Sequence, residues 1–178
     1  LITDLIINNR LLNKNEKQIE AKMTIGAKSQ ETRERNNDNE EPAITENAIW
    51  IQNAGLILLH PFLKPFFKEM RLTDDKGHLK SDAHQKAIQA VHFLATSNRE
   101  FFEANMVFEK FLCGLPLDEP VEKECLLTEK DKSECIVLLQ QVIHHWHALK
   151  NSSSEWLQQL FLQRKGKLIV SDKQVKLM

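Results

Sequence analysis

At residues 49–63 the chain reads Ile49-Trp50-Ile51-Gln52-Asn53-Ala54-Gly55-Leu56-Ile57-Leu58-Leu59-His60-Pro61-Phe62-Leu63, and from there it is densely apolar. Proline disfavours the α conformation for the residue before it but fits the first position of a helix. We therefore expect a short helix that ends at Leu59 and a second helix from Pro61 to about Arg71. Pro65 lies inside the second helix, so that helix alternatively begins there. A folded domain is predicted over residues 49–178.

Two segments of different composition precede this domain. Residues 1–25 carry aliphatic side chains near helical spacing, which indicates a helical fragment or the end of a longer helix. In residues 26–48, Ile44 is the only large aliphatic residue among charged residues, Asn, Gln and Ser. Such a segment buries too little apolar surface to offset the entropy of ordering, so we predict a flexible polar linker.

Capping residues divide the first part of the domain into helices. Ser81 is predicted to cap a helix that extends through about Thr96, where small and aliphatic residues recur every three or four positions. Asn105 is predicted to cap a helix over Met106–Cys113, and Gly114 stands at the position that follows a helix end. Residues 115–120 contain two prolines and are expected to form an extended connector.

The remaining elements follow the same logic. Thr128 with Asp131 resembles a capping box and is expected to start a helix that reaches about Leu149. Ser152 with Glu155 is a second capping box, expected to start a helix over Trp156–Arg164 that Gly166 ends. Alternating apolar residues within 167–178 predict a terminal β-hairpin. The fold class is thus mainly α: a compact domain of about five or six helices with a C-terminal hairpin, preceded by a flexible polar arm.

Composition excludes several functional classes. The chain has 178 residues and a formal net charge of −1, so it lacks the basic excess that nucleic-acid binding requires. No apolar run approaches the roughly 20 residues that span a bilayer. The three cysteines form no CxxC pair and are expected to be reduced and partly buried.

The strongest candidate for chemistry is the segment His144-His145-Trp146-His147. On a helix, His144 and His147 share a face and can bind one metal ion with a third ligand, which leaves a metal-dependent enzyme as an open alternative. An apolar stripe occupies most of this helix, however, and no acidic residue or cysteine stands one turn upstream on the histidine side. We predict no catalytic, cofactor-binding or metal-binding residue, no small-molecule substrate and no enzymatic activity.

Four motifs resemble the contractile injection system tape measure family, in that family's order and spacing over about residues 49–170. They are Ile51–Leu63, Phe111–Val121 (FLCGLPLDEPV), His145–Ser153 (HWHALKNSS) and Leu160–Leu168 (LFLQRKGKL). The resemblance selects as family-motif or candidate interaction positions Asn53, Gly55, His60, Pro61, Phe62, Cys113, Gly114, Pro116, Pro120, Trp146, Asn151, Arg164 and Gly166.

The resemblance implies a structural role in a phage-tail-like contractile particle. It implies that a region N-terminal to this domain sets the length of the inner tube, while the C-terminal domain lies near the spike and baseplate. As a continuous helix, residues 1–48 extend roughly 70 Å at most, so the length-setting region is expected to lie mostly outside these residues. The implied partners are inner tube, spike or baseplate proteins, and repeated equivalent sites in a symmetric tube favour a homo-oligomer.

The resemblance also implies where the protein resides. It would be made in the bacterial cytoplasm and packed inside an injection particle that can be released from the cell. A baseplate or cap adaptor of the same particle, acting in assembly and measuring nothing, is the alternative that stays closest to these motifs.

Overall fold

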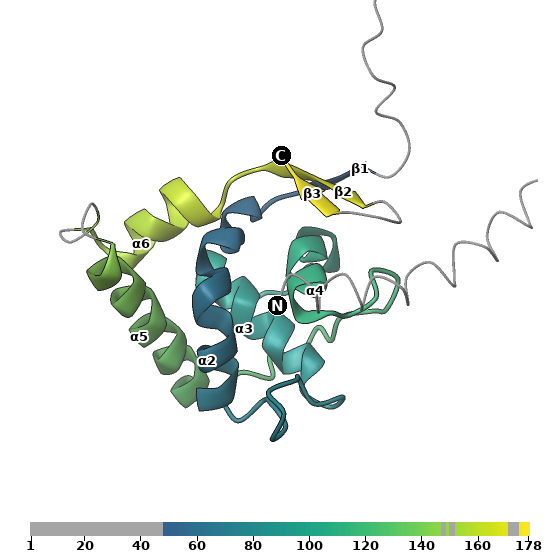
Figure 1. The fold of residues 1–178 in the computed structure, drawn as a ribbon, viewed down its shortest axis with the longest axis horizontal. Helices are drawn as coiled ribbons and strands as arrows, with labels where there is room; N and C mark the ends of the chain where they lie inside the picture. The colour runs from purple at the N-terminus through teal and green to yellow at the C-terminus, as the bar shows by residue number, and fades with distance from the viewer. Residues whose placement is uncertain (1–47, 147–148, 150–151, 171–174) are drawn as a thin grey trace, which may run out of the picture.

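The computed structural model describes residues 48–146, 149, 152–170 and 175–178. The predicted segment 1–25, nearly all of the linker 26–48, the ligand candidate His147 and the motif residue Asn151 lie outside the described residues. Within them, five α-helices and a small antiparallel sheet surround one apolar core, which confirms a mainly helical domain with a C-terminal hairpin (Figure 1). No helix among these residues has the length and apolar character needed to cross a bilayer.

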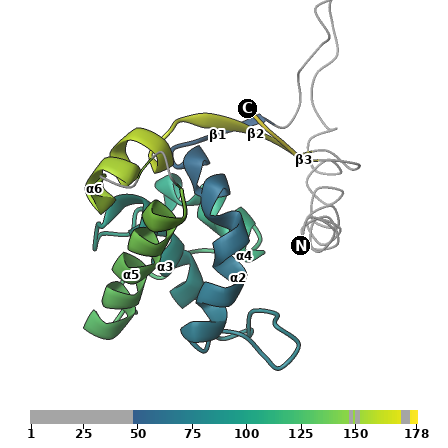
Figure 2. The same ribbon diagram turned by 60° about the vertical axis from the view of Figure 1, so that its left-hand side comes forward.

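The core is built around helix α3 (His84–Thr96). Every residue from Ala87 to Ala95 is buried, and α3 contacts both α4 (Val107–Cys113) and α5 (Glu129–His145). A helix that is buried on all sides belongs at the centre of a domain. Helix α2 (His60–Glu69) runs beside α5 in both views (Figures 1 and 2).

The domain begins with a strand. Strand β1 (Ala48–Ile51) pairs antiparallel with β2 (Gly166–Val170), which pairs with β3 (Val175–Leu177), so the predicted hairpin is part of a three-stranded sheet. The sheet lies at the upper end of the helical body in both views, above α4 and on the side away from α6 (Figures 1 and 2). No element was predicted for residues 48–51, because pairing with a strand more than a hundred residues away decides their conformation.

The segment after β1 agrees with the prediction. A 3₁₀ helix, η1 (Ala54–Leu59), runs directly into α2, with Pro61 in its first turn and Pro65 inside it. The alternative start of α2 at Pro65 is therefore wrong.

Two of the predicted helix signals are confirmed. Thr128 and Asp131 form a reciprocal capping box at the start of α5, with Thr128 N donating to Asp131 Oδ2 over 2.8 Å. Gly114 ends α4 with φ 72°, in the left-handed region that glycine adopts without strain.

Other predicted boundaries were wrong by a few residues. Ser81 lies in a turn, and α3 begins after Ala83 without a side-chain cap. Asn105 belongs to the short 3₁₀ helix η2 (Glu103–Asn105), and α4 begins after Met106. Helix α5 ends at His145 because Trp146 adopts an extended conformation (ψ 103°), well before the predicted Leu149.

The last helix also differs from its prediction. Ser153, rather than Ser152, caps α6 (Ser154–Leu157), and its Oγ accepts from Trp156 N over 3.2 Å. The chain then widens into a π-helical segment, η4 (Gln158–Leu162). Gly166 does not end this helix; it opens β2.

Candidate functional site

The first and last motifs meet backbone to backbone. A Cβ on Gly55 would lie only 1.7 Å from Phe161 O, and a Cβ on Gly166 would lie 2.6 Å from Ala54 Cβ. Ala54 N donates to Arg164 O over 2.8 Å. Gly55 and Gly166 therefore allow η1 to pack directly on η4 and β2, and these motif positions, with the backbone of Arg164, hold the architecture together.

A buried polar cluster fixes the end of β1 to the core. Glu109 of α4 is fully buried, and its Oε1 accepts from Asn53 Nδ2 over 2.7 Å and contacts His92 Nδ1 of α3 at 2.8 Å. The motif residue Asn53 thus has a structural partner that sequence reasoning missed. The available signal was the position of Glu109 four residues before Cys113, which places an acid on the buried face of a helix.

Polar side chains of α3 and α4 also hold the connector that follows α4. Lys110 Nζ donates to Glu119 O over 2.6 Å and to Leu117 O over 3.0 Å. Gln85 Nε2 donates to Pro120 O over 3.0 Å, and the fully buried Gln89 binds the backbone of residues 122–126. The motif positions Pro116 and Pro120 therefore lie in a segment whose path is fixed from the core.

The motifs Ile51–Leu63 and Phe111–Val121 meet at a pocket of about 620 Å³. Its walls are α2, the loop of residues 73–81 with the start of α3, and the segment from Leu112 to Glu119. Three motif positions line it beside His60: Cys113, Gly114 and Pro116. His60 Nε2 is buried and has no hydrogen-bond partner among the described residues, while burial raises the pKa of the Cys113 thiol above its usual range. The structure thus joins four of the predicted positions at one cavity.

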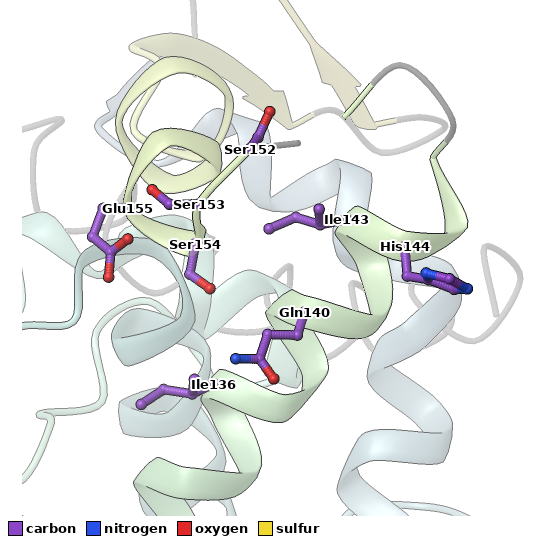
Figure 3. Close-up of a pocket in the computed structure, with 8 residues that line it drawn as sticks. All are labelled: Ile136, Gln140, Ile143, His144, Ser152, Ser153, Ser154 and Glu155. Carbon is purple, nitrogen blue, oxygen red and sulfur yellow. The ribbon is translucent and has the colours of Figure 1, made fainter. Parts of the chain in front are cut away.

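A smaller pocket of about 420 Å³ lies between the C-terminal half of α5 and the start of α6. Figure 3 shows Ile136, Gln140 and Ile143 of α5 opposite Ser152–Glu155, with the ring of His144 directed away from the serines. Nearby, the ring of Phe62 packs edge-on against His145 at 5.6 Å between centroids. Trp146 is half-buried against the core, and Pro61 is exposed in the first turn of α2.

The metal alternative gains no support from the described residues. His144 is exposed, and no cluster of three or more His, Cys, Asp or Glu side chains there is arranged to hold a metal ion. His147, the proposed second ligand, lies outside them.

Comparison with known proteins places the chain in a family. The family model described as contractile injection system tape measure protein matches residues 4–178. No curated protein and no solved structure matches the chain. Because the family model covers nearly the whole sequence, the chain belongs to the contractile injection system tape measure protein family.

Proposed function

We propose that residues 48–178 are the anchoring domain of a tape measure protein and hold it near the spike or baseplate end of the inner tube, while the region N-terminal to the domain sets tube length. The observation that carries this proposal is the way the chain enters the domain. Residues 1–47 precede β1 in the chain, and β1 leads directly to residues that are hydrogen-bonded in the core, Asn53 and Ala54.

Several independent contacts support β1 as an anchor. It is hydrogen-bonded along its whole length to β2, with Ala48 opposite Ile169 and Ile51 opposite Gly166. The side chain of Ile51 is only 2% exposed. Just after the strand, Asn53 donates a hydrogen bond to Glu109, and the backbone N–H of Ala54 donates to the carbonyl of Arg164. A force that pulls on the N-terminal end of β1 therefore acts on all of these contacts at once, as a structural anchor requires.

The motif residues fit a structural role better than a chemical one. Asn53, Gly55, Gly114 and Gly166 serve packing, turns and buried hydrogen bonds. In this proposal the partners are inner tube, spike or baseplate proteins, and several copies of the chain assemble together in the tube. The protein is made in the bacterial cytoplasm, is packed into the particle and leaves the cell with it.

The test measures particle length and the place of the domain together. Insertions of seven residues N-terminal to residue 26, in the region proposed to set the length, are expected to lengthen particles in proportion, by about 10 Å each where the added chain is helical. The matched control replaces 26–47 with a scrambled segment of equal length, which is expected to leave the length unchanged. Electron cryo-microscopy of the same particles is expected to find the domain in the lumen near the spike. Constant length together with a domain on the outside of the particle would instead support a baseplate or cap adaptor.

A further inference from the structure

Strand β1 has one edge that no other described strand covers. In the sheet order β1-β2-β3, only β2 lies beside it. On the far side of β2, Lys167 N donates to Met178 O over 2.7 Å and Met178 N donates to Lys167 O over 2.9 Å. Neighbouring residues of a strand direct their backbone groups to opposite sides, so Gly166 and Leu168 direct theirs toward β1.

The register then shows which backbone groups of β1 face the open edge. Ile49 and Ile51 stand opposite Leu168 and Gly166, so their N–H and C=O groups point toward β2. The N–H and C=O groups of Ala48 and Trp50 point away from β2, and no described residue outside the sheet forms a backbone hydrogen bond with them. A row of unpaired donors and acceptors of this kind is a template for another strand, because a β-strand presents the matching groups.

The side chains of β1 do not protect this edge. Edge strands commonly carry a charged residue, a proline or a bulge that prevents pairing with another chain. β1 reads Ala-Ile-Trp-Ile and pairs with β2 residue for residue, so it has none of these, whereas β3 at the opposite edge carries Lys176. The side chain of Trp50 is 71% exposed, with Lys167 Nζ 5.5 Å from the centre of the ring. Tryptophan is enriched among the residues that dominate binding energy, so its exposure here favours a binding surface.

We propose that β1 binds an extended segment of a partner protein of the particle, which adds to the sheet as a fourth strand. Alternate side chains of the added strand lie on the face of Ile49 and the buried Ile51, so the segment carries uncharged β-branched or aromatic residues there. The side chains between them lie on the face of Trp50. The inference names the partner chemistry of the anchoring domain and so rests on the proposed function.

A second copy of the chain fits this edge less well than a partner protein does. Two β1 strands related by a twofold axis pair antiparallel, which points their N-terminal ends in opposite directions. The proposed function instead has the N-terminal regions of all copies run the same way along the tube. A strand of another protein is free of this constraint.

Amide hydrogen exchange of the full chain, followed by NMR, tests whether the edge is open. We expect fast exchange at Ala48 and Trp50 and slow exchange at Ile49 and Ile51, whose amides face β2. Slow exchange of the Trp50 amide in a monomer would mean that another segment of the chain covers the edge. Slow exchange in a dimer, identified by analytical ultracentrifugation, would mean that a second copy covers it. Either result would overturn the proposal.

The second test supplies strands as ligands. A displayed heptapeptide library is selected on the full chain, and an enriched peptide is titrated by calorimetry. We expect enrichment of peptides rich in β-branched and aromatic residues. N-methylation of the peptide backbone is expected to weaken binding at least about tenfold at every second residue and less than about threefold between them, because only alternate amides of an added strand face β1. Selection of no peptide, or losses without this period of two, would overturn strand addition.

Ala48→Pro is the matched change in the protein. Proline is tolerated at the first residue of a strand, and here it removes an amide that faces the open edge. We expect the midpoint of thermal unfolding to stay within a few degrees, while binding of the selected peptide weakens at least about fivefold. Ala48→Ser keeps the amide and is expected to bind within about twofold of the unchanged chain. Equal binding by the two variants would overturn the edge as the site.

The two proposals fail in different ways. A domain located at the spike whose peptide binding lacks the period of two overturns strand addition and leaves the anchoring role in place. Strand binding by a domain found on the outside of the particle overturns the anchoring role and retains the binding edge.

Discussion

At Gly55 the packing leaves no room for a side chain, because the nearest atom to an added Cβ is a backbone oxygen, Phe161 O, at 1.7 Å. Backbone cannot move aside as a flexible side chain does, so η1 and η4 would have to separate. Gly77 presents a different case. It has φ 81°, but the nearest atom to an added Cβ is the flexible end of Lys64.

Gly55→Ala is therefore expected to lower the free energy of unfolding by about 3 kcal/mol, at the upper end of overpacking costs. Gly77→Ala is expected to cost about 1 kcal/mol, from backbone strain alone. Urea unfolding followed by circular dichroism measures both. Equal costs would show that η1 and η4 do not touch as described.

The three cysteines are expected to differ sharply in reactivity. Cys125 is exposed, whereas burial raises the pKa of Cys135 to about 12 and raises that of Cys113 even further, with Glu109 adding to the effect. Only the thiolate attacks a disulfide reagent, so a raised pKa and burial both slow the reaction. At pH 8 we expect one fast equivalent of thiol in an Ellman titration of the native chain and two more only after unfolding. Cys125→Ser should abolish the fast phase, and a fast phase that persists would contradict the burial of the other two.

Among the elements, those with local signals were predictable and those set by distant partners were not. The capping box of α5 and the glycine after α4 act within four residues, so the sequence shows them directly. Strand β1 depends on pairing with β2, and α5, which ends at His145, packs against α6 further along the chain. Ser81 has the right chemistry for a cap, but the chain turns through Ala83 before α3 begins.

The same distinction holds for the candidate site. The motifs singled out His60, Gly114 and Pro116, but nothing in the sequence indicated that these residues line the same pocket. Glu109 and Gln89 were missed because their partners lie far away in sequence, and Lys110 because two of its three partners are backbone oxygens. A buried polar residue reveals its role only when the atoms that satisfy it are known.

Helix α5 offers a prediction that depends on pH. Burial raises the pKa of Asp131, but the hydrogen bonds from Lys86 and Thr128 outweigh it and leave the pKa below the ordinary 3.8. A lowered pKa means that this carboxylate stabilises the fold above about pH 4 and that its contribution disappears as pH falls through the folded-state pKa. Asp131→Asn is therefore expected to cost about 1–2 kcal/mol at pH 7 and progressively less below pH 4.

Chemical unfolding at a series of pH values measures this difference. The control is Asp118→Asn, an exposed residue of the connector that forms no ion pair among the described residues. It is expected to change stability by less than about 0.5 kcal/mol. A cost for Asp131→Asn that stays constant down to pH 2 would contradict the role of its charge.

At the scale of the whole molecule, the order of elements makes the first strand a structural link. The sheet brings together residue 48 and the last residues described, since β2 lies between β1 and β3. Beyond the sheet, Asn53 reaches Glu109 of α4, and Glu109 reaches His92 of the central helix α3. A load entering at β1 would thus pass through two side-chain contacts to the centre of the core.

This arrangement predicts how far the chain can be shortened from its N-terminal side. The core contacts described begin with β1, so the segment 48–178 is expected to unfold within a few degrees of the full chain. Removing residues 48–53 as well takes away the buried Ile51 and leaves Glu109 without Asn53, losses of about 2–5 and 1–3 kcal/mol. For a domain of this size such losses lower the melting temperature by at least about 10 °C.

Differential scanning calorimetry of the full chain, 48–178 and 54–178 compares the three directly. The control for truncation is the full chain carrying both Ile51→Ala and Asn53→Ala. This double variant loses the same buried side-chain contacts but keeps the backbone of β1. Its melting temperature is expected between those of 48–178 and 54–178, because the β1–β2 hydrogen bonds remain. If 54–178 melts at the same temperature as the full chain, β1 carries no load into the core, and the proposed anchoring role of β1 is overturned.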